Sequence, residues 1–261
     1  MSAATSRFER LPDPLAGAEQ GEGLQRADGA AELSFARRAA GTTLSRLYQR
    51  TPCQVHFPNA AAGQPALAML LNTAGGLTGG DKVAVSAAAE PAAAVTLTTA
   101  AAEKIYRSLG LDCAVAVALE VGAGAWLEWL PQETILFAGS RLRRTIGADI
   151  AATGRLLAAE MLVFGRVARG ERWIGGALRE RWRIVRGGEL AWYDATTLDG
   201  DAIDHPAGLA SAESFATALY VGADAERHLP LARDLTEGAA CRAGATLVNG
   251  VLLARFLGTA I

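Results

Sequence analysis

The sequence predicts a mainly β fold, because apolar residues recur at every second position in many short stretches and glycine pairs separate these stretches. The clearest case is the stretch 111–121, where six apolar side chains alternate with Asp, Ala and Glu. Residues 178–184 alternate in the same way and set three arginines opposite Leu178, Trp182 and Ile184, which predicts a strand with a cationic face. Short strands, glycine turns and few helical stretches together favour a β-rich class.

Further strands are expected where short apolar stretches lie between turn residues. The pair Gly187-Gly188 separates two such stretches and predicts a hairpin. The stretch 155–164 suits a helix as well as a strand, because leucine and alanine are good helix formers, so both remain open there. The expected strands are 32–38, 43–48, 66–71, 82–86, 94–99, 125–129, 155–164, 189–196, 215–221 and 245–256.

One helix is expected at 223–237, with Asp224 as its cap and Leu231 and Leu235 one turn apart. Pro230 inside this stretch predicts a kink or a late start. Residues 1–28 are rich in Gly, Pro, Glu and Gln and are expected to form a loose leader. Residues 29–261 are expected to form a single β-rich domain, because neither a repeat nor a charge-rich linker divides them.

Composition excludes several classes of protein. The 261 residues are 51% hydrophobic and 20% charged, too apolar for a disordered chain. Lys and Arg number 25 and Asp and Glu 27, so the net charge of −2 disfavours nucleic acid as a main partner. No apolar stretch reaches the ~18–20 residues of a membrane helix. The three cysteines are far apart, which disfavours disulfides and zinc and fits a reducing cytoplasm.

The most unusual segment is the turn 72–81, which carries four glycines within six residues: Gly75, Gly76, Gly79 and Gly80. Such a density predicts positive φ angles or close backbone approach. A phosphate-binding loop is disfavoured, because Asp81 follows Gly80 where lysine is needed, and a strand rather than a helix is expected next. The turn is therefore expected to hold Asp81 in a fixed position.

Several acids lie in apolar surroundings. Glu160 lies in the most apolar stretch of any acid, and Asp194 follows another apolar stretch. Glu128 lies between Trp126 and Trp129, and we expect its side chain to face solvent. A buried carboxylate is expected to be paired, hydrated or functional, and nearby arginines could supply structural salt bridges. The carboxylates of Asp81, Glu160, Asp194 and Glu171 suit a hard or borderline divalent cation that is held loosely.

Catalytic arrangements are sparse. The three histidines match no metalloprotease spacing. A Cys53–His56 dyad is conceivable, but a buried structural cysteine is the commoner interpretation. A glycosidase-like pair of Glu128 and Glu133 is disfavoured, because five residues of strand span ~17 Å.

Four segments resemble, in the same order, those of the urease accessory protein UreD family, also called UreH. The most specific are Gly-Gly-Leu-Thr-Gly-Gly-Asp at 75–81 and Leu-Glu-Trp-Leu-Pro-Gln at 127–132. The resemblance extends over about 32–257, and the four segments are 71–81, 98–108, 127–135 and 164–171.

The resemblance implies layered antiparallel or mixed β-sheets with about two helices in the C-terminal part, and a non-enzymatic factor for nickel insertion into urease. Members of this family bind apo-urease and UreF, and reach UreG through UreF. An internal water-filled tunnel has been proposed as the nickel route, and its acids correspond to Asp81, Glu160 and Asp194. Glu103, where the family often has Ser or Thr, adds a charge near that route. With Glu171 these acids form the expected transient nickel path, and no catalytic residue or tightly bound cofactor is expected.

Two expectations concern partners. The chain ends at Ile261 without the Pro-Arg-x-Trp segment of the family, so a short or truncated C-terminal tail is expected, and the residues that bind UreF are not assigned. The alternative to a nickel path is a pure scaffold, which holds apo-urease for UreF and UreG without conducting metal. The scarcity of His and Cys fits a path that releases nickel rather than trapping it.

Overall fold

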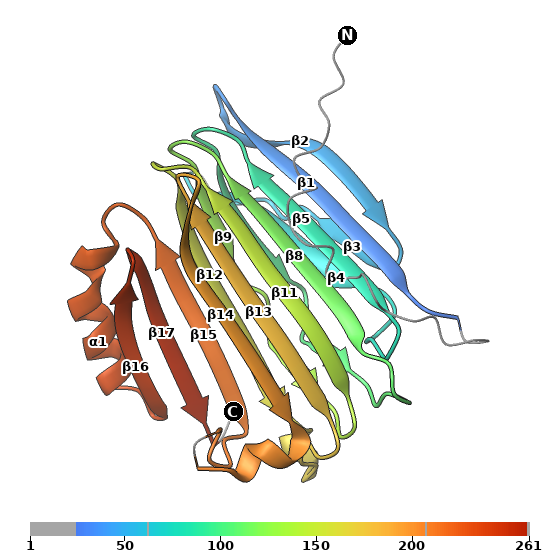
Figure 1. The fold of residues 1–261 in the computed structure, drawn as a ribbon. Coiled ribbons are helices and arrows are strands. Elements are labelled where there is room, and N and C mark those ends of the chain that lie inside the picture. Colours follow the sequence, from blue (N-terminus) through green and yellow to red (C-terminus); the bar gives the residue numbers. More distant parts are fainter. Residues whose placement is uncertain (1–24, 62, 207, 260–261) are drawn as a thin grey trace.

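The chain folds into two β-sheets that pack face to face (Figure 1). A computed structural model describes residues 25–61, 63–206 and 208–259. Sheet A has seven strands, in the spatial order β14 (Glu189–Asp199), β13 (Ala177–Arg186), β11 (Arg141–Ile150), β8 (Cys113–Val121), β5 (Lys82–Ala89), β1 (Asp28–Arg38) and β2 (Gly41–Arg50).

Sheet B has ten strands, and with sheet A it confirms the predicted mainly β class. Its main path runs β16 (Arg242–Val248), β17 (Val251–Gly258), β15 (Ser214–Val221), β12 (Arg155–Phe164), β9 (Trp126–Trp129), β6 (Ala94–Thr99), β4 (Ala66–Asn72) and β3 (Cys53–His56). Off this path, β10 (Thr134–Leu136) pairs with β12 and with β7 (Glu103–Ile105).

The central strands of each sheet are parallel, although no α-helix of the described residues lies in the connections between them. Between β4 and β13 the chain passes repeatedly from one sheet to the other, so a strand of the opposite sheet takes the place of a crossover helix. The parallel pairs β5–β8, β8–β11 and β11–β13 in sheet A are matched by β4–β6, β6–β9 and β9–β12 in sheet B. β1 extends the parallel set of sheet A, because it pairs in parallel with β5. Antiparallel pairs border these sets: β1–β2 and β13–β14 in sheet A, and β3–β4 and β12–β15 in sheet B.

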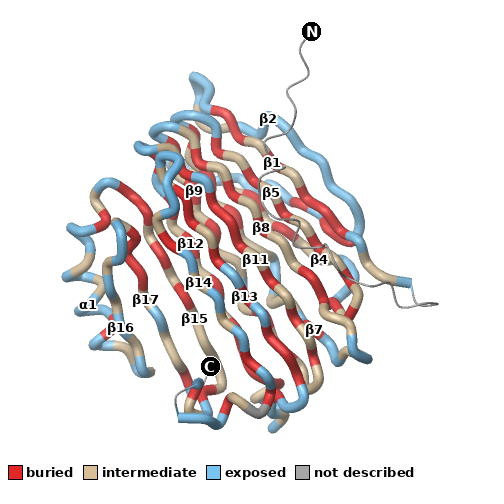
Figure 2. The backbone as a smooth tube through the Cα atoms, viewed as in Figure 1, coloured by how far each residue is buried: buried red, intermediate tan, exposed pale blue. Residues whose placement is uncertain are grey.

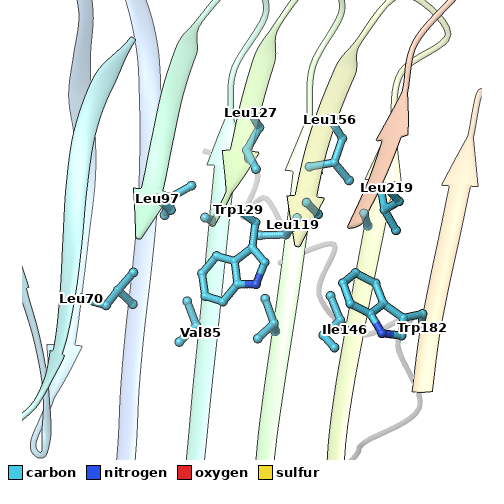
Figure 3. Close-up of a cluster of buried hydrophobic side chains, with 14 of the residues drawn as sticks. Leu70, Val85, Leu97, Leu119, Leu127, Trp129, Ile146, Leu156, Trp182 and Leu219 are labelled. Atoms are coloured by element: carbon cyan, nitrogen blue, oxygen red, sulfur yellow. The ribbon is translucent and has the colours of Figure 1, made fainter. Parts of the chain in front are cut away.

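The hydrophobic core lies between the two sheets and consists of the side chains that point inward at every second position of the strands. Buried and more exposed positions alternate along most strands (Figure 2). Leu119 and Ile146 of sheet A meet Leu127, Trp129 and Leu156 of sheet B (Figure 3). Full burial of one such side chain contributes about 1.5–3 kcal/mol, so the shared layer holds the sheets together.

Most predicted strands are present within one to three residues of their expected ends. The hairpin at Gly187-Gly188 joins β13 and β14, and both glycines have positive φ, 61° and 89°. The ambiguous stretch 155–164 is strand β12, which pairs with β9 on one side and β15 on the other. Pairing on both sides outweighs the local helix propensity of its leucines and alanines.

Other expectations were wrong or incomplete. The single strand expected at 245–256 is a hairpin of β16 and β17, because Asn249 and Gly250 form a turn with φ of 47° and 76°. Strand β11 was missed, since its arginines obscure the alternation of Leu142, Ile146 and Ile150. Strands β3, β7 and β10 have only three or four residues, too few to show a period.

The described residues contain one α-helix, α1 (Leu229–Glu237), which packs against β16. Pro230 lies in its first turn, so the predicted late start is confirmed, and a 3₁₀ helix (Ala225–His228) precedes it. Asp224 does not cap it, because its carboxylate accepts a bond from the Tyr220 hydroxyl at 2.6 Å. Leu231 and Leu235 are 58% and 67% exposed rather than packed inward.

The ends of the chain bear on two further expectations. Of the expected leader, residues 1–24 lie outside the described residues, and β1 begins at Asp28. No helix in the described part of the chain has the length and apolar character needed to span a membrane.

The glycine-rich turn connects β4 to β5 and requires glycine where other segments approach it. A Cβ at Gly79 would overlap the Ser108 hydroxyl and the carbonyl oxygen of Leu111. A Cβ at Gly76, whose φ is 150°, would overlap the ring of Tyr106. The density of glycine therefore reflects close packing of this turn against 104–111 as well as backbone conformation.

We expect Gly79→Ala to lower the free energy of unfolding by about 1–3 kcal/mol, because the new methyl group overpacks this contact. Gly244→Ala is the matched control, since a Cβ there meets no atom within 4 Å. Chemical denaturation of both variants and the parent checks the prediction. Equal stability of the two variants would contradict it.

Candidate functional site

A cavity of about 230 Å³ lies between the two sheets, beside the glycine-rich turn. Val85, Val117 and Leu142 of sheet A line it on one side, and Leu70 and Trp129 of sheet B on the other. Its volume has room for several water molecules, since each occupies about 30 Å³ in the liquid. The cavity is therefore an internal space with mainly apolar walls and a few polar groups.

The cavity reaches the surface at one end. Its lining residues Gly75, Ala100, Ala101, Lys104 and Gln132 are exposed. Lys104 lies in β7, Gly75 in the glycine-rich turn, and the others in the loops before β7 and before β10. Polar side chains mark both ends, with Glu103 near these exposed residues and Glu160 and Arg144 among the buried ones. The lining therefore contains one carboxylate beside exposed residues and one ion pair among buried residues.

Two of the lining residues, Arg144 and Glu160, belong to a buried cluster of three charged side chains. Glu160 extends inward from β12 of sheet B, and Arg144 and Glu180 extend inward from β11 and β13 of sheet A. Arg144 Nη1 lies 2.6 Å from Glu160 Oε2, and its Nη2 lies 2.5 Å from Glu180 Oε2. The three side chains are 3–4% exposed, so the cluster crosses the core from one sheet to the other.

Neutral donors complete the bonding of both carboxylates. Trp129 Nε1 donates to Glu160 Oε1 at 2.8 Å, and Trp182 Nε1 donates to Glu180 Oε1 at 3.0 Å. Burial raises the pKa of Glu160, although the attraction of Arg144 opposes the shift. Burial alone would lower the pKa of Arg144, but the two carboxylates raise it. The guanidinium therefore stays charged and stabilises the anions beside it.

Glu103, in β7, is the acid near the opening. The Asn72 Nδ2 group donates to both of its oxygens, at 3.1 and 3.0 Å, and the backbone N–H of Lys104 donates at 3.0 Å. Burial raises the pKa of this carboxyl, and the three hydrogen bonds oppose the shift. No guanidinium pairs with Glu103 in the described part of the chain, so its charge is less compensated than that of Glu160.

Asp81 is buried but has a structural set of partners. Its Oδ1 accepts a hydrogen bond from the backbone N–H of Ala27 at 2.9 Å, and its Oδ2 accepts one from Thr78 N–H at 2.7 Å. These bonds fasten the glycine-rich turn to the segment before β1, as expected of a turn that fixes Asp81. This carboxylate is not among the groups that line the cavity.

Asp194 and Glu171 also lie outside the cavity lining. Asp194, in β14, accepts a bond from Arg255 Nη2 of β17 at 2.6 Å, which joins an edge of sheet A to sheet B. Glu171 pairs with Arg166 and accepts the backbone N–H of Ala138 at 3.1 Å. Of the five predicted path residues, the cavity therefore brings together Glu103 and Glu160 and leaves out the other three.

The sequence analysis counted Arg144 only among the nearby arginines that could pair with a buried acid, and it missed Glu180. The sequence held a signal in both strands, because each charged residue lies on the same face as two buried apolar residues. Arg144 lies between Leu142 and Ile146 on that face, and Glu180 between Leu178 and Trp182. A charged residue on the apolar face of a strand must find a partner across the core. Only knowledge of which strands face each other identifies that partner.

The remaining candidates form no second site. Cys53 is buried on one face of β3 and His56 is exposed on the other, which excludes a dyad. Burial and nearby Glu103 raise the pKa of Cys53 to about 11. Glu128 is half-buried and accepts bonds from Thr96 and Trp126. Among the described residues, no three His, Cys, Asp or Glu side chains cluster in a way that could hold a metal ion.

We expect Arg144→Met to lower the free energy of unfolding by about 3–5 kcal/mol, because it leaves two carboxylates buried without a cation. Arg46→Met, which removes an exposed pair with Glu32, is the control and should change it by less than about 1 kcal/mol. Urea titration of both variants provides the measurement. Equal losses in the two variants would show that the cluster is not tightly coupled to folding.

We expect Glu103→Gln to alter how stability depends on pH. The folded state holds the Glu103 proton more tightly than the unfolded state, whose pKa is near 4.5. Parent stability should therefore fall relative to that of the variant as the pH rises above about 4.5, up to the raised pKa of the folded state. Unfolding free energies from pH 4 to 7 provide the test, with the exposed Glu226→Gln as control. A constant difference over this range would contradict the prediction.

Comparison with known proteins identifies the chain. A family model described as UreD urease accessory protein matches residues 27–261. The urease accessory protein UreD of Magnetococcus marinus is 42% identical over 98% of this chain and 88% of that protein. UreD 1 of Methylobacterium radiotolerans is 44% identical over 95% of this chain and 90% of its own length. The chain therefore belongs to the UreD family of urease accessory proteins, which are not enzymes.

Proposed function

We propose that this protein passes Ni²⁺ toward urease through the cavity between its sheets, while it binds apo-urease and UreF in the cytoplasm. Through UreF it would act together with the GTPase UreG. Family membership supports the general role in urease maturation. The observation that carries the nickel path is a single cavity with one carboxylate near its opening and another at its buried end.

The chemistry of the cavity suits brief contact with a divalent cation. Carboxylate and amide oxygens attract Ni²⁺ less strongly than imidazole or thiolate groups do. Cys53, the soft donor in the lining, has a raised pKa and is mainly a neutral thiol. The guanidinium of Arg144 repels a cation that approaches Glu160, so the ion would be attracted inward without being retained.

A pure scaffold is the second candidate. The partners of Asp81, Asp194 and Glu171 favour the scaffold. Backbone N–H groups bond to the carboxylate of Asp81 and arginines pair with the other two, so none of the three is open to a cation. In that role the protein would hold apo-urease for UreF and UreG, and its internal acids would matter only for stability.

We expect Glu103→Gln to lower urease activation several-fold in nickel-limited cells, because it removes charge at the opening and keeps a side chain of the same size. Excess nickel should restore activation, since a higher ion concentration compensates for weaker attraction. The measurement is urease activity in cells that co-express urease, UreF, UreG and the variant. Glu160→Gln, deeper in the cavity, should have the same effect.

Glu226→Gln is the matched control, because it removes a negative charge from an exposed position outside the cavity lining. Thermal unfolding and pull-down of UreF show whether each variant is folded and assembled. Full activation by both cavity variants in limiting nickel would reject conduction and leave the scaffold. Failure of the parent protein to bind apo-urease or UreF would reject both.

A further inference from the structure

The side chain of Asn72 is bonded to the acid near the cavity opening. Asn72 is the last residue of β4 and Glu103 is the first residue of β7, so the two residues come together from positions 31 apart in the chain. Both residues line the cavity. We call Asn72 and Glu103 the opening pair.

The orientation of the Asn72 amide follows from its two contacts. Its Oδ1 accepts the backbone N–H of Ala74 at 2.9 Å, at the exposed start of the glycine-rich turn. Because a backbone N–H can only donate, this contact identifies the amide oxygen and directs the NH₂ group toward Glu103. Nδ2 then lies 3.1 and 3.0 Å from Glu103 Oε1 and Oε2. The turn therefore fixes the amide, and the amide fixes the carboxylate.

These contacts leave one oxygen of the carboxylate partly free. An ionised carboxylate has about four lone-pair sites on its two oxygens. In the part of the chain that the structure describes, Glu103 Oε1 accepts hydrogen bonds from Asn72 and from the Lys104 N–H at 3.0 Å, whereas Oε2 accepts one from Asn72 alone. A cation or a water molecule can therefore approach Glu103 at Oε2.

A neutral amide suits this position better than a charged donor or no donor. An arginine would also orient a carboxylate, but its positive charge would oppose a cation that approaches the same group. Without any donor the carboxylate would keep its rotamer freedom, and its burial would be less well compensated. Asn72 therefore orders Glu103 while the negative charge remains available.

We propose that Asn72 is a positioning residue for nickel passage, because it orients Glu103 so that one carboxylate oxygen stays open to a cation. This inference rests on the proposed function. It also implies that donor and acceptor are interchangeable within the opening pair. With Asp at position 72 and Gln at position 103, the new amide can donate to the new carboxylate, and the N–H groups of Ala74 and Lys104 still have an oxygen to bond.

The first test compares the swap Asn72→Asp/Glu103→Gln with Glu103→Gln alone in the full-length protein. Urease activity is measured in nickel-limited cells that co-express urease, UreF and UreG. We expect Glu103→Gln to lower activation several-fold and the swap to restore it to within about twofold of the parent, since a carboxylate again accepts from an amide at the opening. Asn59→Asp/Glu103→Gln is the matched control and should restore nothing, because its new charge is exposed and outside the cavity lining.

The second test measures the pairing itself, without nickel. Asn72→Asp alone places two carboxylates against each other, so at neutral pH it should raise the equilibrium constant for unfolding at least about tenfold. Adding Glu103→Gln should reverse most of that increase. Urea titration of the two single variants, the swap and the parent completes the cycle, and purely additive effects would show that Asn72 does not hold Glu103.

The outcomes separate this inference from the proposed function. If Glu103→Gln lowers activation and a folded swap does not restore it, or the Asn59 control restores it equally, positioning is wrong and the proposed function stands. If Glu103→Gln activates urease fully, conduction through the cavity is rejected and the inference fails with it. Should thermal unfolding show that the swap does not fold, Asn72→Ala decides: several-fold lower activation is expected, and activation equal to the parent would overturn the inference.

Discussion

The buried cluster of Glu160, Arg144 and Glu180 determines how the two sheets are positioned against each other. Moving each ion out of water costs several kcal/mol, and the close contacts to Arg144 and the two indole N–H groups offset that cost only in this one geometry. A shift of β12 by one residue would turn Glu160 outward and leave Arg144 with one partner. Apolar packing alone tolerates small slips, whereas a cluster of buried charges does not, so the cluster selects one alignment of the sandwich.

The winding of the chain explains why such a cluster can form. The chain places β11 in sheet A, β12 in sheet B and β13 in sheet A again. The inward-facing charged residues of these three successive strands therefore meet in the core. The same alternation leaves the cavity next to the cluster, where the loop before β7 and the glycine-rich turn replace regular strand packing. Core, cluster and cavity are therefore products of one topology.

Local pattern and long-range pairing differ in how far the sequence reveals them. The period of two predicted most strands, and the isolation of Glu160 in an apolar stretch correctly singled it out as a buried acid. Neither pattern identifies Arg144 as its partner, because that contact depends on which strands of opposite sheets face each other. For the same reason the sequence did not reveal that Glu103 and Glu160 share a cavity while Asp81 does not. The Asn249-Gly250 turn is a different case, since its hairpin signal is local and was present in the sequence.

The bonding of the two cavity acids implies different parts in the proposed nickel route. Both oxygens of Glu160 are engaged, one by an indole and one by a full positive charge, so a cation bound there must compete with Arg144. Glu103 is held by amide donors, which orient the carboxylate without cancelling its charge. A cation would therefore be attracted mainly at the outer acid, and the inner pair would limit how tightly it is held. Weak retention then follows from the same ion pair that aligns the sheets, which makes conduction compatible with a rigid core.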